Sequence, residues 1–286
     1  MEPQQSTPYK EFITRLGWKV ETIDGVNIFL RKFPLMMGNM AKIHRPENLP
    51  STKKLIPLFQ KYAIRTLVIE PVARQNKQKL SQWCRTISKH VTISHSPYLP
   101  TKTILIDLTP TEENIFRSFS EAKRRAVRRA QKNNLCIKES TNINELIRIK
   151  NRSSGFFGFI TTTGINKLWP IFAPNHAAIL LAYKPENKLI GGVLLIYWDK
   201  RAYYWIAGAS KEGKKLAAPT LLVWEACKLA KKKKCTKFDF VGVWDERIPK
   251  ENTSWKGFTK FKEGFGGEKV YYPVFSKRLI PGNLSK

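Results

Sequence analysis

The sequence has 286 residues and a formal net charge of +29, from 51 Lys and Arg against 22 Asp and Glu. This excess favours polyanionic partners, either nucleic acid or an anionic membrane face, while 42% hydrophobic residues exclude a disordered basic tail. The polar first ten residues are not a secretory signal, and no apolar run is long enough to span a membrane. We therefore expect a cytoplasmic protein, with peripheral contact at the inner membrane face left open.

The first hundred residues alternate helices and strands. Residues 9–16 predict a short helix that Gly17 ends, and Asp24-Gly25 between alternating apolar residues predicts a β-hairpin. Further on, we expect a helix over 51–62, a strand over 66–70, a helix over 75–87 and a strand over 103–107. These elements suffice for a separate core, so residues 1–108 are predicted to form one domain.

A strongly basic helix is predicted next. Thr109 is the expected N-cap, Pro110 the first helical residue, and Glu112 completes a capping box. The apolar stripe consists of Ile115, Phe119, Ala122, Ala126 and Ala130. The opposite face carries Lys123, Arg124, Arg125, Arg128, Arg129 and Lys132. Because like charges weaken an isolated helix, either an anionic ligand contacts this face or it is simply solvated.

The second half of the chain has a characteristic element order. After a helix over 143–149, strands over 177–183, 189–197 and 202–207 predict an antiparallel meander. A helix over 221–231 begins after Pro219, and a strand over 238–243 follows. This order resembles that of an acetyltransferase-type (GNAT-like) α+β domain, so residues 109–267 are predicted to form a second domain.

The segment between the meander and the long helix is where GNAT-like domains cradle the coenzyme A diphosphate. Here it contains Gly213 in place of the usual glycine pair, and Pro219 lacks a backbone N–H that a phosphate would use. We take these departures as evidence against coenzyme A. Three lysines still make this corner cationic, namely Lys211, Lys214 and Lys215.

Residues 255–267 combine lysines, aromatic residues and glycines in one short segment. Its helical stripe is Phe258, Phe261 and Phe265, and its lysines are Lys256, Lys260 and Lys262. Gly264, Gly266 and Gly267 are expected to end the helix and to bring backbone N–H groups near a ligand. The pattern predicts either an anion-binding corner or an ordinary amphipathic helix with a glycine C-cap.

The cysteines and histidines do not have metal-ligand spacing. Free thiols are expected at Cys84, Cys136, Cys227 and Cys235, of which Cys136 and Cys227 lie within apolar patterns. His90 and His95 lie near Cys84 but fit no zinc pattern, so no metal is expected.

Four blocks of the sequence resemble the FemABX peptidyltransferases, in that family's order. They are residues 120–132, 218–224, 238–242 and 257–267, within a match that extends over residues 60–280. The resemblance implies two tandem GNAT-like domains, the first degenerate and the second active, each a mixed, mostly antiparallel sheet flanked by helices. Residues 268–286 could supply the last strand of the first domain. The implied activity is transfer of an aminoacyl group from charged tRNA to an amine of a peptidoglycan precursor, lipid II or its UDP-linked form, without metal or coenzyme.

The same resemblance assigns roles to individual residues. Lys262 matches a lysine beside the tRNA 3′ end that neutralises a phosphate and the developing oxyanion, and Phe261 would stack on a terminal base. Glu70 stands where the family usually has an Asp in the precursor groove, and it would orient or deprotonate the acceptor ammonium. Arg152 and Tyr204 match positions that contact the phosphates and peptide of the precursor. Phosphate contacts are expected from Lys123, Arg124, Arg125, Arg128, Arg129, Lys256, Lys260 and the lysines at 231–234.

Other interpretations stay open. The same fold could pass an amino acid from tRNA to a protein N-terminus or a lipid, and only the poorly matched N-terminal groove would distinguish these acceptors. A non-catalytic RNA- or membrane-binding module is a second alternative, against which the Phe261-Lys262 pair argues. Acyl-coenzyme A chemistry is a third, disfavoured by Pro219 and the single glycine.

Overall fold

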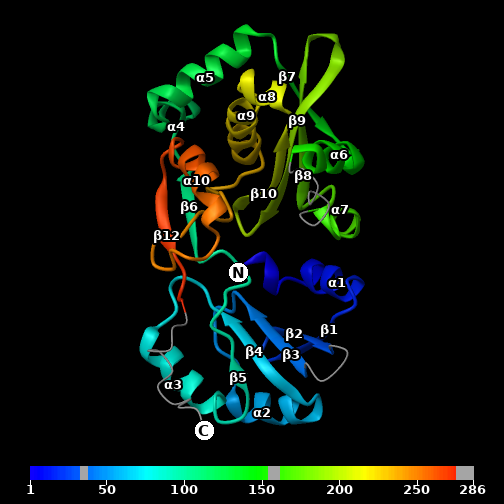
Figure 1. The fold of residues 1–286 in the computed structure, drawn as a ribbon, viewed down its shortest axis with the longest axis vertical. Coiled ribbons are helices and arrows are strands. Elements are labelled where there is room, and N and C mark those ends of the chain that lie inside the picture. The colour runs from blue at the N-terminus through cyan, green and yellow to red at the C-terminus, as the bar shows by residue number, and fades with distance from the viewer. Residues whose placement is uncertain (33–37, 154–161, 275–286) are drawn as a thin grey trace. The chain divides into compact units, whose positions relative to one another are not determined.

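The computed structural model covers residues 1–286 and describes residues 1–32, 38–153 and 162–274. Its contacts divide the chain into two compact units (Figure 1). The first comprises Met1–Thr101 and Val270–Lys286, and the second comprises Lys102–Lys269. Each unit contains a mixed sheet flanked by helices, which confirms the predicted α+β class.

The first unit contains a five-stranded sheet in the order β1-β2-β3-β4-β5. Its strands are β1 (Lys19–Ile23), β2 (Val26–Lys32), β3 (Asn39–His44), β4 (Ile64–Glu70) and β5 (Thr92–Ile93). The pairs β1–β2 and β2–β3 are antiparallel, whereas β3–β4 and β4–β5 are parallel. Asp24 and Gly25 have positive φ values, as a two-residue hairpin turn requires, so the predicted hairpin is confirmed. The sequence patterns predict neither β3 nor β5.

Helices cover both faces of this sheet. They are the 3₁₀ turn η1 (Pro3–Gln5), α1 (Thr7–Arg15), α2 (Thr52–Lys61) and α3 (Lys77–Ile87). Helices α2 and α3 bury Leu55, Phe59 and Ile87 in one core with alternate strand residues such as Leu67. Helix α1 packs on the opposite face, where the Tyr9 and Phe29 ring centroids are 5.9 Å apart. Alternate side chains of each strand therefore face two different surroundings.

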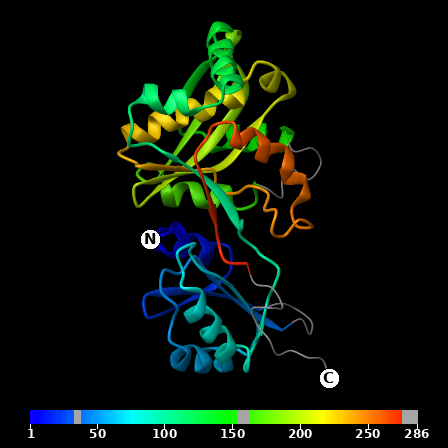
Figure 2. The same ribbon diagram turned by 90° about the vertical axis from the view of Figure 1, so that its left-hand side faces the viewer.

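The second unit contains a seven-stranded sheet in the order β12-β6-β11-β10-β9-β8-β7 (Figure 2). Its strands are β6 (Lys102–Asp107), β7 (Cys136–Ser140), β8 (Ala177–Lys184), β9 (Lys188–Trp198), β10 (Arg201–Ala209), β11 (Lys237–Asp239) and β12 (Glu268–Tyr271). Strands β8, β9 and β10 form the predicted antiparallel meander, and β11 pairs parallel to β10. The long helix between β10 and β11 is the crossover that a parallel pair requires.

Helices flank this sheet on both sides. They are α4 (Glu112–Ser118), α5 (Glu121–Lys132), α6 (Ile143–Ser153), α7 (Ile165–Phe172), α8 (Lys211–Lys215), α9 (Ala218–Lys232) and α10 (Lys256–Glu263), with 3₁₀ turns η3 (Pro185–Asn187) and η4 (Thr253–Trp255). Helix α9 buries Leu222 and Cys227 in the main core together with Val193 and Leu195 of β9. Helix α6 packs on the other face, where Gly192 of β9 leaves room for it beside Leu146.

The predicted basic helix is wrong in one respect, because it is two helices. Thr111, rather than Thr109, caps α4 by accepting a hydrogen bond from the Asn114 backbone N–H at 3.3 Å. Phe119 is extended, with φ −69° and ψ 145°, and its side chain is buried. Ser120 then caps α5. Burial of Phe119 in the core outweighs the helical propensity of the segment.

The stripe predicted along this segment is correct only in part. Ile115, Phe119 and Ala130 are buried, but Ala122 is exposed. Val127 takes the buried position on α5 instead. The break at Phe119 changes the direction of the second helix, so a stripe drawn through one continuous helix selects the wrong residue.

The division of the chain into units differs from the predicted boundary at 108/109. Strand β6 pairs with β11, so residues 102–107 belong to the second unit. The strand at Glu268–Tyr271 lies beside β6 in the seven-stranded sheet. Within the described residues, the C-terminal segment therefore adds no strand to the first sheet. Strand pairing over long sequence separations decides this division, and no local pattern reports it.

Phe265 is the aromatic residue that ties α10 to the core of the second unit. Its ring is fully buried and lies 5.0 Å from the Phe119 ring and 5.7 Å from the Phe240 ring. We expect Phe265→Ala to lower the free energy of unfolding by about 3–5 kcal/mol, measured by urea denaturation. Phe258→Ala is the matched control, since Phe258 is 38% exposed. Equal losses in the two variants would contradict this assignment.

Candidate active site

The two central parallel strands of the second unit separate after three residue pairs. Pairing of β10 with β11 ends at Tyr203 and Asp239, while β10 continues to Ala209 with an irregularity after Tyr204. Beyond Asp239, the chain turns through Val241, which has φ 67° and whose backbone N–H donates to Asp239 Oδ1 at 2.7 Å. The backbone carbonyls that follow β11 are thereby released from pairing with β10.

The side chain of Lys262, a residue of α10, reaches the backbone that follows β11. Its Nζ donates to the carbonyl oxygens of Phe240 at 2.8 Å and Gly242 at 2.7 Å. An ammonium has three donors, and in the described part of the chain the third has no protein partner. Burial lowers the pKa of Lys262 to about 8, with Lys150 lowering it further and Asp239 opposing the shift. Lys262 is therefore a half-buried cation, fixed in orientation, with one donor left for a ligand.

The glycines after Lys262 have a role in packing. Gly266 and Gly267 have φ values of 73° and 94°. A Cβ on Gly266 would lie 2.9 Å from the Ser118 carbonyl oxygen, and one on Gly267 would lie 2.5 Å from that of Leu105. These glycines allow close backbone packing. The Gly266 N–H donates to the Glu263 carbonyl at 3.1 Å, and the expectation that N–H groups of this segment lie near a ligand stays a prediction. Through their packing, the glycines hold α10 in place.

Phe261 lies beside Lys262 on α10, at the edge of the core. Its ring packs edge-on against Phe265 at 5.2 Å, and the Lys123 ammonium lies 3.8 Å from its centroid. Burial lowers the pKa of Lys123 to about 8. One face of the Phe261 ring is therefore already covered by a cation, so a stacking base needs the other face.

Tyr204 and Arg152 lie in contrasting environments. Tyr204 is 8% exposed and packs on the rings of Phe238 and Phe240 at 6.0 and 5.7 Å. Burial raises the pKa of the Tyr204 hydroxyl. Arg152 is exposed in the last turn of α6. Tyr204 thus shares the Phe240 ring with Lys262, whose Nζ lies 5.9 Å from that ring, while Arg152 is solvent-facing.

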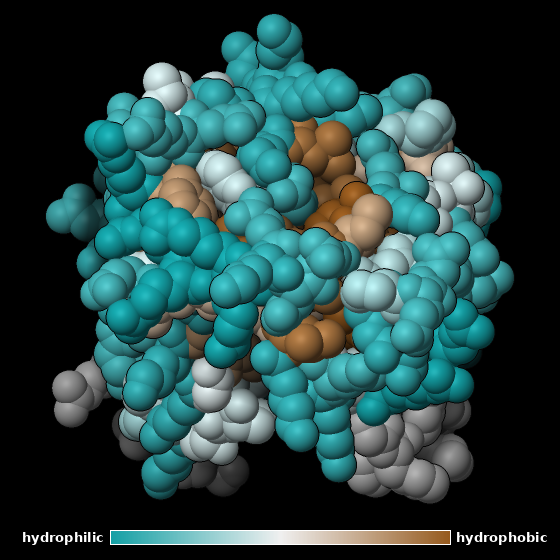
Figure 3. All heavy atoms as spheres, turned by 90° about the horizontal axis from the view of Figure 1, so that it is seen from above, coloured by the Kyte–Doolittle hydropathy of each residue, from teal (hydrophilic) through white to brown (hydrophobic). Residues whose placement is uncertain are grey.

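Some of the predicted phosphate-binding cations hydrogen-bond to the protein's own backbone, and others are exposed to solvent. Arg124 donates to the carbonyl oxygens of Arg117 and Phe119 and so closes the end of α4. Lys231 similarly donates to three carbonyls at residues 108–110. Four exposed cations of α5 form what we call the basic ridge, namely Arg125, Arg128, Arg129 and Lys132. Seen from above in Figure 3, hydrophilic side chains cover most of the surface.

Two further cations of the predicted set lie on α10, and Lys232, Lys233 and Lys234 are exposed at the end of α9. Lys256 places its ammonium 4.6 Å from the centroid of the Trp244 ring. Lys260 is exposed. Together with Lys262, they put three positive charges on one short helix.

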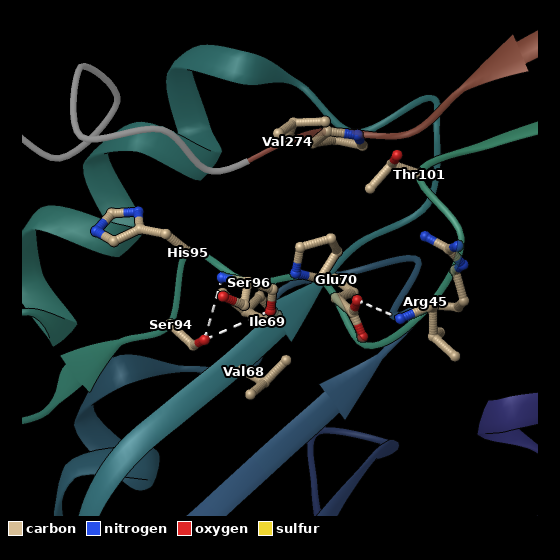
Figure 4. A pocket seen from close by; sticks show the side chains of 12 residues that line it. Arg45, Val68, Ile69, Glu70, Ser94, His95, Ser96, Thr101 and Val274 are labelled. Atoms are coloured by element: carbon tan, nitrogen blue, oxygen red, sulfur yellow. Dashed lines mark hydrogen bonds between the residues drawn. The ribbon is translucent and has the colours of Figure 1, made fainter. Parts of the chain in front are cut away.

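Glu70 lies in the first unit, at the end of β4 (Figure 4). Its Oε1 accepts hydrogen bonds from the backbone N–H groups of Tyr98 at 2.8 Å and Leu99 at 2.7 Å. Its Oε2 lies 3.2 Å from His44 Nε2 without hydrogen-bond geometry, and the side chain is almost fully buried. Burial raises the pKa of Glu70, although both N–H groups and Arg45 oppose the shift. Glu70 therefore fastens the loop at 94–101 with one oxygen and keeps the other unbonded.

Three neighbours of Glu70 were not singled out from the sequence. Arg45 is buried, donates to the carbonyl of Pro100 at 2.6 Å and lies on the Tyr272 ring at 3.4 Å. His44 is neutral, because burial lowers its pKa to about 3. Lys42 lies two residues before His44 on β3. The available signal is the alternation of Lys42 and His44 with Ala41 and Ile43, which is too short to predict the strand by itself.

Other chemistry expected from the sequence can be checked in the described residues. Cys84, Cys227 and Cys235 are free and buried, whereas Cys136 is free but exposed, because β7 is an edge strand. Across residues 1–32, 38–153 and 162–274, no group of three His, Cys, Asp or Glu side chains could hold a metal ion. Among the helices in those ranges, none combines the length and apolar character needed to cross a bilayer.

Comparisons with known proteins identify a family match and several similar folds. Residues 176–273 match the model of the FemAB family. The crystal structure of FemX superposes with a TM-score of 0.75 at 13% identity, covering 95% of this chain and 90% of FemX. L-PGS from Bacillus licheniformis gives a TM-score of 0.55 at 12% identity, covering 91% and 83% of the two chains. A conserved protein of unknown function from Bacteroides thetaiotaomicron gives 0.57 at 9% identity, covering 94% and 88%. No curated protein sequence matches the chain.

Proposed function

From the match of residues 176–273 to the FemAB family model and the fold shared with FemX, we propose that this chain is a FemABX-type enzyme that transfers an aminoacyl group from aminoacyl-tRNA to an amine of the stem peptide of a peptidoglycan precursor. The acceptor is lipid II or its UDP-linked form, and the product extends the interpeptide bridge of the cell wall. The reaction would take place in the cytoplasm, at the inner face of the membrane when the acceptor is lipid II. The observation that carries this proposal is the ammonium of Lys262. Two backbone carbonyls hold it near the point where β10 and β11 stop pairing, and one N–H donor is left for a ligand.

The proposed chemistry is aminolysis of an activated ester. The acceptor nitrogen attacks the ester carbonyl carbon, a C–N bond forms, and the C–O bond to the terminal ribose of tRNA breaks. The proton lost by the amine ends on the ribose oxygen. Negative charge develops on the carbonyl oxygen, where a positioned cation contributes most to the rate. In this proposal Lys262 donates its third N–H to that oxygen.

The other site residues have proposed roles in binding. Phe261 offers its uncovered face to a terminal base, an interaction worth about 1–3 kcal/mol. The basic ridge, Lys256 and Lys260 contact tRNA phosphates without reading sequence. Arg152 contacts a phosphate of the precursor. Tyr204 packs against the Phe240 ring, so its proposed part is to support Phe240 next to Lys262.

A labelled-transfer assay tests the proposal directly. The protein is incubated with total tRNA charged with labelled amino acids and with either lipid II or the UDP-linked precursor. We expect label to appear in the precursor and to disappear after treatment of the tRNA with ribonuclease. Label that stays on tRNA with both precursors would overturn the proposed acceptor.

A lipid acceptor is the second candidate. It is supported by a structural likeness to a C-terminal domain assigned to a lysylphosphatidylglycerol synthetase from Agrobacterium fabrum, with a TM-score of 0.56 at 12% identity. The same assay distinguishes the two when phosphatidylglycerol vesicles replace the precursor. Label extracted with the phospholipid would favour this alternative.

Glu70 is proposed to bind the acceptor ammonium and take up its proton. Replacement by Gln keeps a carbonyl oxygen for the two loop N–H groups but removes the negative charge. We expect Glu70→Gln to lower transfer about 10²-fold with little change in the urea midpoint. Glu21→Gln is the control, since Glu21 bonds to Tyr62 elsewhere in the same unit. Unchanged transfer would limit Glu70 to holding the loop.

The charge of Lys262 predicts a pH dependence. With its pKa lowered to about 8, Lys262 is charged below pH 8 and loses its charge as the pH rises through that value. We expect the ratio of wild-type to Lys262→Arg transfer rates to be constant below pH 7 and to fall about tenfold per unit above pH 8. Ionisation of the acceptor amine affects both transfer rates equally, so its effect cancels in the ratio. A ratio independent of pH between 7 and 9.5 would contradict a catalytic charge on Lys262.

A further inference from the structure

On the side opposite α2 and α3, the first sheet carries charged and polar side chains next to apolar ones. Lys42 of β3 lies there between its cross-strand partners Phe29 of β2 and Val68 of β4, both buried. His44 and Glu70 form the next cross-strand pair on the same face. A lysine in the middle of an apolar row loses hydration, so its position needs an explanation from its surroundings.

Two aromatic rings lie close to the Lys42 ammonium, and no ion pair holds it within the described residues. Its Nζ lies 3.6 Å from the centroid of the Tyr98 ring and 4.7 Å from that of Trp18. Burial lowers the pKa of Lys42 to about 8, Arg31 lowers it further, and Glu70 opposes the shift. Throughout the described chain, no carboxylate oxygen lies within 4.0 Å of this ammonium. Lys42 is thus a desolvated cation without a counter-ion in contact.

Glu70 is the complementary group on the neighbouring strand. Its Oε1 is occupied by the loop, whereas Oε2 has no hydrogen bond within the described residues. Lys42 pairs with Val68 and His44 pairs with Glu70, so Lys42 and Glu70 are diagonal neighbours. Glu70 lies close enough to favour the charged form of Lys42. Two opposite charges are therefore held near each other but out of contact.

We propose that Lys42 and Glu70 together bind an α-amino-acid head group, that is, an ammonium and a carboxylate on one carbon. The ammonium donates to Glu70 Oε2, and the carboxylate accepts from Lys42 Nζ. In this arrangement the head group lies between the two charges and forms one hydrogen bond of about 2.8–3.0 Å with each of them. Tyr98, which is 49% exposed, supplies an apolar wall beside the carboxylate.

This inference rests on the proposed function and adds the class of acceptor. The acceptor side chain ends in an amine next to a carboxylate, as in diaminopimelate, rather than in an amine alone, as in lysine. A lysine side chain satisfies Glu70 but leaves Lys42 desolvated and unpaired. Discrimination arises because the buried cation gains a partner with only one of the two acceptors.

Equilibrium binding of two synthetic stem peptides, without tRNA, tests the inference. The peptides are identical except that residue three is meso-diaminopimelate in one and lysine in the other. We expect wild-type protein to bind the diaminopimelate peptide about 10–100-fold more tightly. Lys42→Met keeps the apolar stem but removes the charge, and it should abolish this preference by weakening only the diaminopimelate peptide. Lys42→Arg should restore part of it.

Lys19→Met is the matched control, since Lys19 lies on β1 with its Nζ 4.6 Å from the Tyr62 ring. It should keep the wild-type preference. Equal affinity of wild-type protein for the two peptides, no binding of either peptide, or an equal loss for both in Lys42→Met would each overturn the inference. Failure of the proposed function has a different signature, because label then stays on tRNA whichever precursor is offered.

Discussion

Replacing Lys262 by Met is expected to reduce aminoacyl transfer about 10²–10³-fold, the loss typical of removing one donor to a developing oxyanion. The physical reason is the fixed position of the ammonium, which two backbone carbonyls hold at the end of β11. Met retains the apolar stem but provides neither the charge nor the donor. The loss should appear in kcat for saturating aminoacyl-tRNA and acceptor, because the interaction forms fully only in the transition state.

The neighbouring residue Lys260 provides the control for this experiment. It lies on the same helix and is exposed, so Lys260→Met should change kcat by less than about threefold while weakening tRNA binding slightly. Circular dichroism and urea unfolding of both variants test that the fold is intact. Near-normal turnover of Lys262→Met would move the reacting centre away from α10.

The second large effect is expected from the basic ridge. Changing Arg125, Arg128, Arg129 and Lys132 together to Gln removes four exposed charges, only one of which, on Arg125, is in an ion pair with Glu121. If these residues contact tRNA phosphates, log Kd against log salt should become shallower by about 3–4, and affinity at 0.1 M salt should fall about 10²–10³-fold. Filter binding of uncharged tRNA over a range of salt concentrations measures both quantities.

An equal number of charges can be removed from the first unit as a control. Lys53, Lys61, Lys77 and Lys79 are exposed on α2 and α3, so their replacement by Gln produces the same change in net charge. The salt slope should then change by less than about 1. Equal slopes for the two quadruple variants would show that tRNA responds to total charge and not to the ridge.

The elements with a complete local signal were predicted correctly. The Asp24-Gly25 turn, the meander of β8 to β10 and helix α9, with Pro219 in its first turn, each depend on neighbours nearby in the sequence. The basic helix was predicted as one element, because its pattern does not reveal that Phe119 leaves the helix to enter the core. Local propensity is a weak preference that burial of a large aromatic side chain can outweigh.

The candidate site also combines residues that the sequence predicts with contacts that only the structure shows. The sequence singled out Lys262, Phe261 and Glu70 by their resemblance to family motifs, and their catalytic roles stay predictions. It did not reveal that Lys262 is fixed by the carbonyls of Phe240 and Gly242, which lie about twenty positions away along the chain. Nor did it select Lys42, whose meaning depends on its partners on β2 and β4.

Composition, charge and short motifs by themselves determined the α+β class, and they predict a polyanionic partner and a functional role for residues 255–267. These properties reside in single residues and in neighbours along the chain. Only the tertiary structure decided that β6 belongs to the second unit, that the glycines after Lys262 serve packing, and that Lys42 faces Glu70 without touching it. Each of these depends on strands and backbone groups brought together from distant positions, where packing and pairing, rather than local propensity, set the free energy.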